Sequence, residues 1–119
     1  MQRLLLTVVA PVVFAASAAN AQTTTKDLTK VSAHEYVRLC ALSENAHPCL
    51  HAIYVNATVN RLLDAIKNQK SFCPTASRAF PPDDIVARVV AWLRLHPASL
   101  YKQSSESLSA ALVAMYPCR

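Results

Sequence analysis

Four cysteines, Cys40, Cys49, Cys73 and Cys118, are spread over a chain of 119 residues that contains no glycine. An even number of cysteines in a small exported protein indicates a disulfide framework. Zinc ligands usually come in closely spaced cysteine pairs, whereas the nearest two cysteines here are nine residues apart, so a zinc site is disfavoured. Tight β-hairpins favour glycine, and its absence points toward helices.

The N-terminus has the features of a secretion signal. Arg3 gives a basic start, residues 4–16 form a mostly apolar run, and Ala19-Asn20-Ala21 has the small-x-small form that signal peptidase cleaves. We therefore predict a signal peptide over residues 1–21 and a location in the periplasm. The apolar run is shorter than the ~20 residues that span a bilayer, which disfavours an uncleaved anchor or any stable membrane insertion.

The distribution of charge argues against nucleic acids as partners. The chain carries a net charge of +5, which falls by one when Arg3 is removed with the signal. These charges are scattered, and no basic stripe with interleaved aromatic residues is present, so we expect no nucleic-acid binding. The mature length corresponds to one domain, which we divide into a flexible segment over residues 22–31 and a helical domain over 32–119.

Apolar periodicity predicts an all-α domain of four helices and no sheet. Ser32 and Glu35 form a capping box, so the first helix should run from Ala33 to about Leu42. The second should begin at Pro48, leaving His47 outside, and reach about Gln69. Its expected core stripe contains Leu50, Ile53, Tyr54, Ala57, Leu62, Ala65 and Ile66.

Two shorter helices are expected after a loop over residues 71–80. The third should follow Pro81-Pro82, carry Asp83 and Asp84 in its first turn, and stop at His96-Pro97. The fourth should begin near Ser104 or Ser105 and stop at Pro117, with Leu108, Ala111, Leu112 and Met115 facing the core.

This helix plan ranks the three possible disulfide pairings. The second helix spans ~30 Å, so Cys49 at its start cannot meet Cys73 beyond its end, because bridged Cα atoms lie within ~7 Å. Cys40 and Cys49 flank a short turn, and Cys73 and Cys118 close a second helical hairpin. We therefore predict Cys40–Cys49 with Cys73–Cys118. Cys40–Cys73 with Cys49–Cys118 remains the second choice.

No cofactor, metal or catalytic site is expected. His47 and His51 are four residues apart, but two histidines without a third ligand are usually solvated side chains. No free cysteine, nucleophile motif or separated carboxylate pair accompanies the histidines, so we do not expect an enzyme.

Several elements of the mature chain together resemble the Rap/Tai family of type VI secretion immunity proteins. They are Cys40, Cys49, Tyr54, Cys73-Pro74, His96-Pro97, Ala111-Leu112 and Tyr116-Pro117-Cys118. The resemblance covers the chain from about Ser32 to Arg119. This chain departs from the family pattern at Asn56, where a glycine is common, and at Val59 and Asn60, where an acidic residue often occurs.

The resemblance implies a periplasmic all-helical toxin inhibitor, often a dimer, that binds a secreted peptidoglycan amidase and occludes its catalytic cleft. A small periplasmic stress or chaperone-like protein is the alternative function. That alternative predicts many client proteins and unfolding or dissociation near pH 3, driven by carboxylates rather than histidines.

Loops are the expected contact regions for a protein partner, because recognition residues concentrate there. The loop over residues 75–80 offers Arg78 and the ring of Phe80, which we expect to be exposed. The loop over residues 99–105 offers Tyr101, Lys102 and Gln103. An aromatic anchor among polar groups is suited to plugging a cleft.

Overall fold

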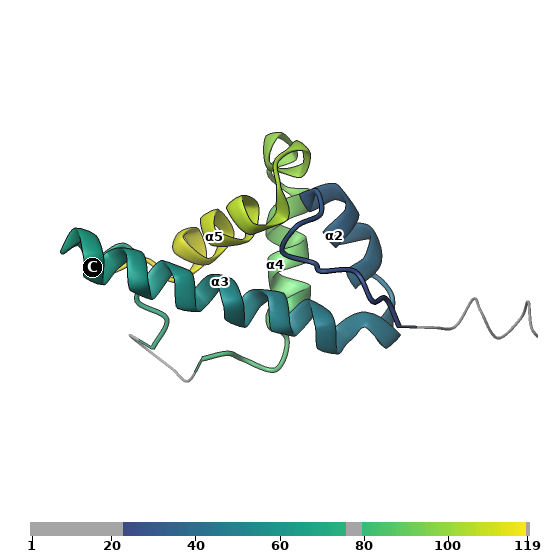
Figure 1. The fold of residues 1–119 in the computed structure, drawn as a ribbon, viewed down its shortest axis with the longest axis horizontal. Coiled ribbons are helices and arrows are strands. Elements are labelled where there is room, and N and C mark those ends of the chain that lie inside the picture. The colour runs from purple at the N-terminus through teal and green to yellow at the C-terminus, as the bar shows by residue number, and fades with distance from the viewer. Residues whose placement is uncertain (1–22, 76–79, 119) are drawn as a thin grey trace, which may run out of the picture.

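The computed structural model describes residues 23–75 and 80–118, so the predicted signal peptide and Arg78 lie outside the described residues. Figure 1 shows the arrangement of the helices. Within these ranges the elements are α2 (Ala33–Cys40), α3 (Ala46–Lys67), α4 (Ile85–Arg94) and α5 (Ser104–Met115), with short 3₁₀ helices η1 (Ser43–Asn45) and η2 (Pro97–Tyr101). The described part of the chain has two isolated β-bridges and no strand, which confirms the all-α prediction.

Helix α2 begins as its capping residues predict. The Ser32 hydroxyl accepts the Glu35 amide at 3.0 Å. The Glu35 carboxylate, however, accepts hydrogen bonds from Arg38 and Lys26 at 2.7–2.8 Å, so the reciprocal half of the predicted capping box is wrong. The bonds from Arg38 and then Lys26 lower the pKa of Glu35 to about 2.

Helix α3 is shifted two residues toward the N-terminus from its predicted bounds. Pro48 still lies in its first turn, but His47 lies inside the helix, contrary to prediction. At the other end Asn68 adopts the left-handed conformation, with φ 51°. The Asn68 and Gln69 amides donate to the Ala65 and Asp64 carbonyls, so asparagine terminates the helix where glycine is usual.

The start of α4 differs from the prediction. The helix begins at Ile85, so Asp83 and Asp84 precede it rather than occupy its first turn. The Asp84 carboxylate instead accepts from Arg88 Nε at 2.9 Å, one helical turn ahead. The last helix begins at Ser104, as predicted.

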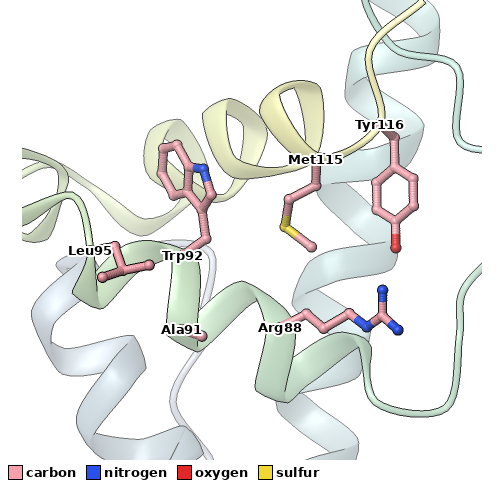
Figure 2. Close-up of a pocket in the computed structure, with 6 residues that line it drawn as sticks. All are labelled: Arg88, Ala91, Trp92, Leu95, Met115 and Tyr116. Carbon is pink, nitrogen blue, oxygen red and sulfur yellow. The ribbon is translucent and has the colours of Figure 1, made fainter.

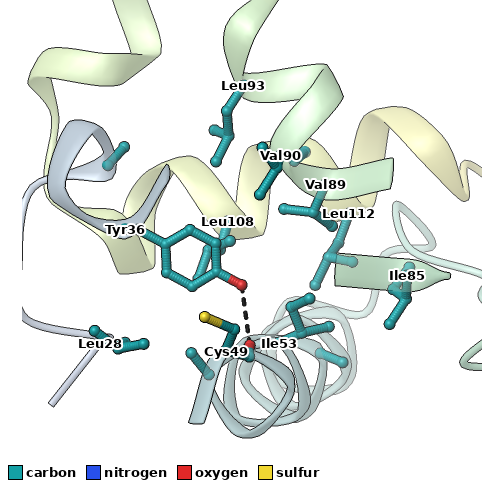
Figure 3. Close-up of a cluster of buried hydrophobic side chains, with 14 of the residues drawn as sticks. Leu28, Tyr36, Cys49, Ile53, Ile85, Val89, Val90, Leu93, Leu108 and Leu112 are labelled. Atoms are coloured by element: carbon teal, nitrogen blue, oxygen red, sulfur yellow. Dashed lines mark hydrogen bonds between the residues drawn. The ribbon is translucent and has the colours of Figure 1, made fainter. Parts of the chain in front are cut away.

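The core lies where the four helices meet. Figure 3 shows Tyr36 at its centre, with its hydroxyl donating to the Cys49 carbonyl at 2.9 Å. Burial raises the pKa of the Tyr36 phenol. Leu28 is also fully buried and Thr24 bonds Asn45, contacts that a flexible segment over residues 22–31 does not account for. The other labelled core residues are Cys49, Ile53, Ile85, Val89, Val90, Leu93, Leu108 and Leu112.

Both preferred disulfides are present. Cys40 and Cys49 have Cα atoms 6.0 Å apart, and Cys73 and Cys118 have Cα atoms 4.9 Å apart. The second bridge is supported by the Cys73 amide, which donates to the Tyr116 carbonyl at 2.8 Å. Figure 1 accordingly shows the C-terminus beside the end of α3.

One part of the core prediction is wrong. Of the residues expected in the core stripe of α3, Tyr54, Leu62 and Ile66 are exposed, and Ala65 is exposed as well. The side of α3 that faces α5 and α4 is instead completed by polar residues, namely Asn56, Asn60 and Asp64. Apolar side chains therefore remain on the outer side of this helix.

Candidate functional site

An open groove with a mainly apolar lining lies between α4 and α5. It encloses about 470 Å³, within the range of small binding sites. Figure 2 shows its lining residues, which come from the outer side of α4 and from the end of α5. They are Arg88, Ala91, Trp92, Leu95, Met115 and Tyr116.

Trp92, which lines one end of this groove, stacks against His96. Their rings stack with centroids 3.8 Å apart and an angle of 15° between planes. His96 Nδ1 lies 2.7 Å from the Trp92 carbonyl oxygen, which holds the imidazole at the end of α4. Leu95, between them in the chain, is 78% exposed. Fixed aromatic surface beside an exposed aliphatic side chain is typical of protein contact sites.

The other end of the groove is polar. Arg88 pairs with Asp84, and this hydrogen bond lowers the pKa of the Asp84 carboxyl. Figure 2 shows the Arg88 guanidinium on the same side as the Tyr116 hydroxyl. Both partners of the ion pair are substantially exposed, so the pair contributes little to stability and leaves its charges available to a ligand.

Phe80 is not the exposed ring that the sequence suggested. It is half-buried, and its ring packs edge-on against Tyr116 at 5.2 Å and against Phe72 at 6.1 Å. Such edge-to-face pairs are a favourable aromatic geometry. Phe80 therefore packs against Tyr116, which lines the groove, rather than projecting from the loop into solvent.

The second predicted contact loop has exposed side chains on a fixed backbone. Tyr101 is 86% exposed, and Lys102 and Gln103 are exposed too. The Lys102 carbonyl accepts from the Ala33 amide at 2.9 Å, and the Ser104 amide donates to the Val31 carbonyl at 2.7 Å. A loop tied to α2 in this way presents its side chains with little further ordering cost on binding.

The two predicted contact loops do not form one tip. Phe80 precedes α4 and η2 follows it, so they lie at opposite ends of a ten-residue helix, about 15 Å long. The groove along α4 lies between them. Sequence periodicity predicted Trp92 and Met115 as core residues, so it did not point to a groove here. In the structure both side chains are partly buried, and the neighbouring Leu95 is exposed.

Asn56 and Asn60, two of the positions that depart from the family pattern, do not face solvent. Ser109 Oγ donates to Asn56 Oδ1 at 3.2 Å, and Asn60 Nδ2 donates to the Ser109 carbonyl at 3.3 Å. Asn56 is only 2% exposed. These amides therefore fix the register of α3 against α5, since buried polar groups require partners.

The histidine pair shows no metal geometry. His47 and His51 are both exposed on α3. Among residues 23–75 and 80–118, no group of three metal-ligating side chains comes together.

Comparison with known protein families identifies the domain. The family model of Rap1a immunity proteins matches residues 32–118. No curated protein and no solved structure gave a match. No helix in the described part of the chain is long and apolar enough to cross a membrane, and the two disulfides indicate a secreted or periplasmic protein. The match covers the four helices, both disulfides, the α4–α5 groove and the loop over residues 99–105, which we call the η2 loop. The chain therefore belongs to the Rap1a immunity protein family.

Proposed function

We propose that this protein protects its cell by binding a peptidoglycan amidase toxin of a type VI secretion system in the periplasm and blocking the toxin's catalytic cleft. The observation that carries the proposal is the family match over residues 32–118. Membership implies a protein toxin as partner. The amidase and the compartment follow from the resemblance of the mature chain and from the predicted signal peptide.

Two surface features support a protein partner. The η2 loop projects Tyr101 from a backbone tied to α2, and an exposed tyrosine with a fixed backbone is the usual form of an interface hot spot. The groove beside it can accept an apolar side chain against Trp92 and Leu95. We assign Tyr101 to the toxin's cleft and the groove to a segment next to that cleft.

The test is a binding and protection assay with cysteine peptidoglycan amidases that type VI secretion systems deliver. Each amidase is directed to the periplasm of a test strain, and lysis is measured with and without the full immunity chain. The affinity of the purified mature proteins is measured by calorimetry. We expect a complex with equal numbers of the two chains and protection from lysis.

Two variants locate the contact. Tyr101→Ala and Leu95→Asp should each weaken binding about 30-fold or more, as hot-spot substitutions of at least about 2 kcal/mol do. Leu42→Ala is the matched control, because Leu42 is an exposed apolar residue outside the groove and the η2 loop.

Two results would overturn the proposal. One is a wild-type chain that neither binds any of these amidases nor prevents lysis. The other is capture of many unrelated periplasmic proteins with similar affinity, which would support the chaperone-like alternative.

A further inference from the structure

The segment that precedes α2 is folded onto the domain, and we call residues 23–31 the strap. Figure 1 shows it running from the start of α3 toward the start of α2. At its beginning the Thr24 amide donates to Asn45 Oδ1 at 2.8 Å, and Asn45 is buried just before α3. The family match begins at residue 32, so the strap lies outside the residues that it covers.

A local turn and one buried side chain hold the strap in place. The Asp27 carboxylate accepts hydrogen bonds from the Thr29 amide at 3.0 Å and from the Thr29 hydroxyl at 2.6 Å. The Lys30 amide donates to the Asp27 carbonyl at 3.0 Å, and aspartate is favoured at the first position of such turns. Leu28, inside this turn, is 3% exposed and belongs to the core. The strap is therefore an ordered part of the domain.

Ser104, the first residue of α5, connects the strap to the end of the η2 loop. Its hydroxyl donates to the Leu28 carbonyl at 2.6 Å, and its amide donates to the Val31 carbonyl at 2.7 Å. Ser104 is completely buried, and a buried hydroxyl requires a hydrogen-bond partner. The strap supplies that partner, so the position of Ser104 depends on the strap.

The residues next to Ser104 are paired in the same way. The Ala33 amide donates to the Lys102 carbonyl at 2.9 Å, and Ser32 forms an antiparallel bridge with Gln103. Tyr101, directly before this paired stretch, has an almost fully exposed side chain. The direction in which its ring projects is therefore set mainly by the backbone that carries it.

We propose that the strap positions the η2 loop for toxin binding, with Leu28 and Ser104 as the positioning residues. This inference rests on the proposed function, in which Tyr101 enters the toxin's cleft. Both positioning residues are buried, so they act through the loop rather than by contact with the toxin. A loop that is already fixed loses less conformational freedom on binding, which raises the affinity.

Hydrogen exchange of the free mature protein, followed by NMR, is the first test and needs no toxin. In Ser104→Ala and Leu28→Ala, the amides of Ser104 and Ala33 should exchange at least about tenfold faster, because the bonds to the strap no longer hold the loop. The Leu95 amide, bonded to Ala91 within α4, is the internal reference for unfolding of the whole domain. Ser104→Ala removes a single hydroxyl, so it carries the test even if Leu28→Ala does not fold.

Ser109→Ala is the matched control. Ser109 lies on the same helix, but its hydroxyl donates to Asn56 of α3 rather than to the strap. Its loss should leave the exchange of the Ser104 amide, relative to the Leu95 amide, as in wild type.

Calorimetry with an amidase that wild type binds is the second test. Ser104→Ala should weaken binding about tenfold, whereas Ser109→Ala should bind like wild type. In the Tyr101→Ala background, Ser104→Ala should cause little further loss, because the strap acts through the Tyr101 ring. A purely structural role for Ser104 would produce the same loss in both backgrounds.

Unchanged exchange of the Ser104 amide in Ser104→Ala would overturn the inference, as would equal losses of affinity with and without Tyr101. A wild type that bound no amidase would instead overturn the proposed function. The two failures are distinguishable, because the exchange rates are measured without toxin.

Discussion

The Cys73–Cys118 bridge should contribute more stability than the Cys40–Cys49 bridge. The two bridges close loops of very different length, because their sequence separations are 45 and 9 residues. On the loop-entropy model, closure of these loops in the unfolded chain corresponds to about 4 and about 2.6 kcal/mol. The expected difference is about 1.4 kcal/mol. The longer loop contains α4 and α5, whereas the shorter one contains η1 and the first residues of α3.

A direct comparison of cysteine variants would mix two effects, because Cys49 is fully buried and its replacement also removes core volume. We therefore propose two variants that each keep one bridge, Cys40→Ala/Cys49→Ala and Cys73→Ala/Cys118→Ala. Each variant is unfolded in urea under oxidising and then reducing conditions. The free energy lost on reduction then reports the remaining bridge, without a change of side chain.

Reduction of Cys73–Cys118 should lower the free energy of unfolding by about 4 kcal/mol, a large part of the 5–15 kcal/mol typical of a domain. The denaturant slope should also rise, because the unfolded chain expands. Circular dichroism and Trp92 fluorescence would follow the transition. If reduction of Cys40–Cys49 cost as much as, or more than, reduction of Cys73–Cys118, the loop-entropy reasoning would be refuted for this protein.

Two further changes test the packing and the electrostatics of the fold. Leu108→Ala should lower the free energy of unfolding, measured in urea, by about 2–5 kcal/mol, because Leu108 is completely buried. The control Leu42→Ala, at an exposed position, should change it by less than about 1 kcal/mol. Equal effects of the two substitutions would contradict the assigned core. The Asp64 carboxylate accepts from Ser71 and from the Phe72 amide, and these bonds lower its pKa below the ordinary 3.8. The stability that Asp64 contributes should be complete above pH 3.8 and should disappear as pH falls through the folded pKa. The thermal unfolding midpoints of wild type and Asp64→Asn should therefore converge in acid. A difference between the midpoints that stayed constant with pH would exclude this explanation.

Local patterns in the sequence determined the helices and their limits to within a few residues. Ser32 starts α2, and His96-Pro97 ends the run of α4, because capping and proline act on the adjacent backbone alone. The sequence also ranked the disulfide pairings correctly: the rigid length of α3 excludes a Cys49–Cys73 bridge, and the short turn between Cys40 and Cys49 favoured the pairing that the structure shows.

The sequence of α3 alone did not determine which of its apolar residues face the core. Apolar side chains occur on both sides of this helix, so periodicity allowed Tyr54, Leu62 and Ile66 to be placed inside. In the structure, the side that meets α5 is completed by Asn56 and Asn60, whose amides find partners on α3 and α5. A polar residue can be buried only where another element supplies its hydrogen bonds, and a single helix carries no information about that element.

The candidate site shows the same division. The sequence by itself led us to predict Tyr101, Lys102 and Gln103 as contact residues, because they form a polar, aromatic-bearing stretch between two helices. Only the tertiary structure showed that Phe80 packs edge-on against Tyr116, and that Trp92 and Leu95 line a groove between α4 and α5. The physical reason is that capping, helix length and cysteine spacing act along the chain, whereas burial and exposure are set by residues distant in sequence that share the same space.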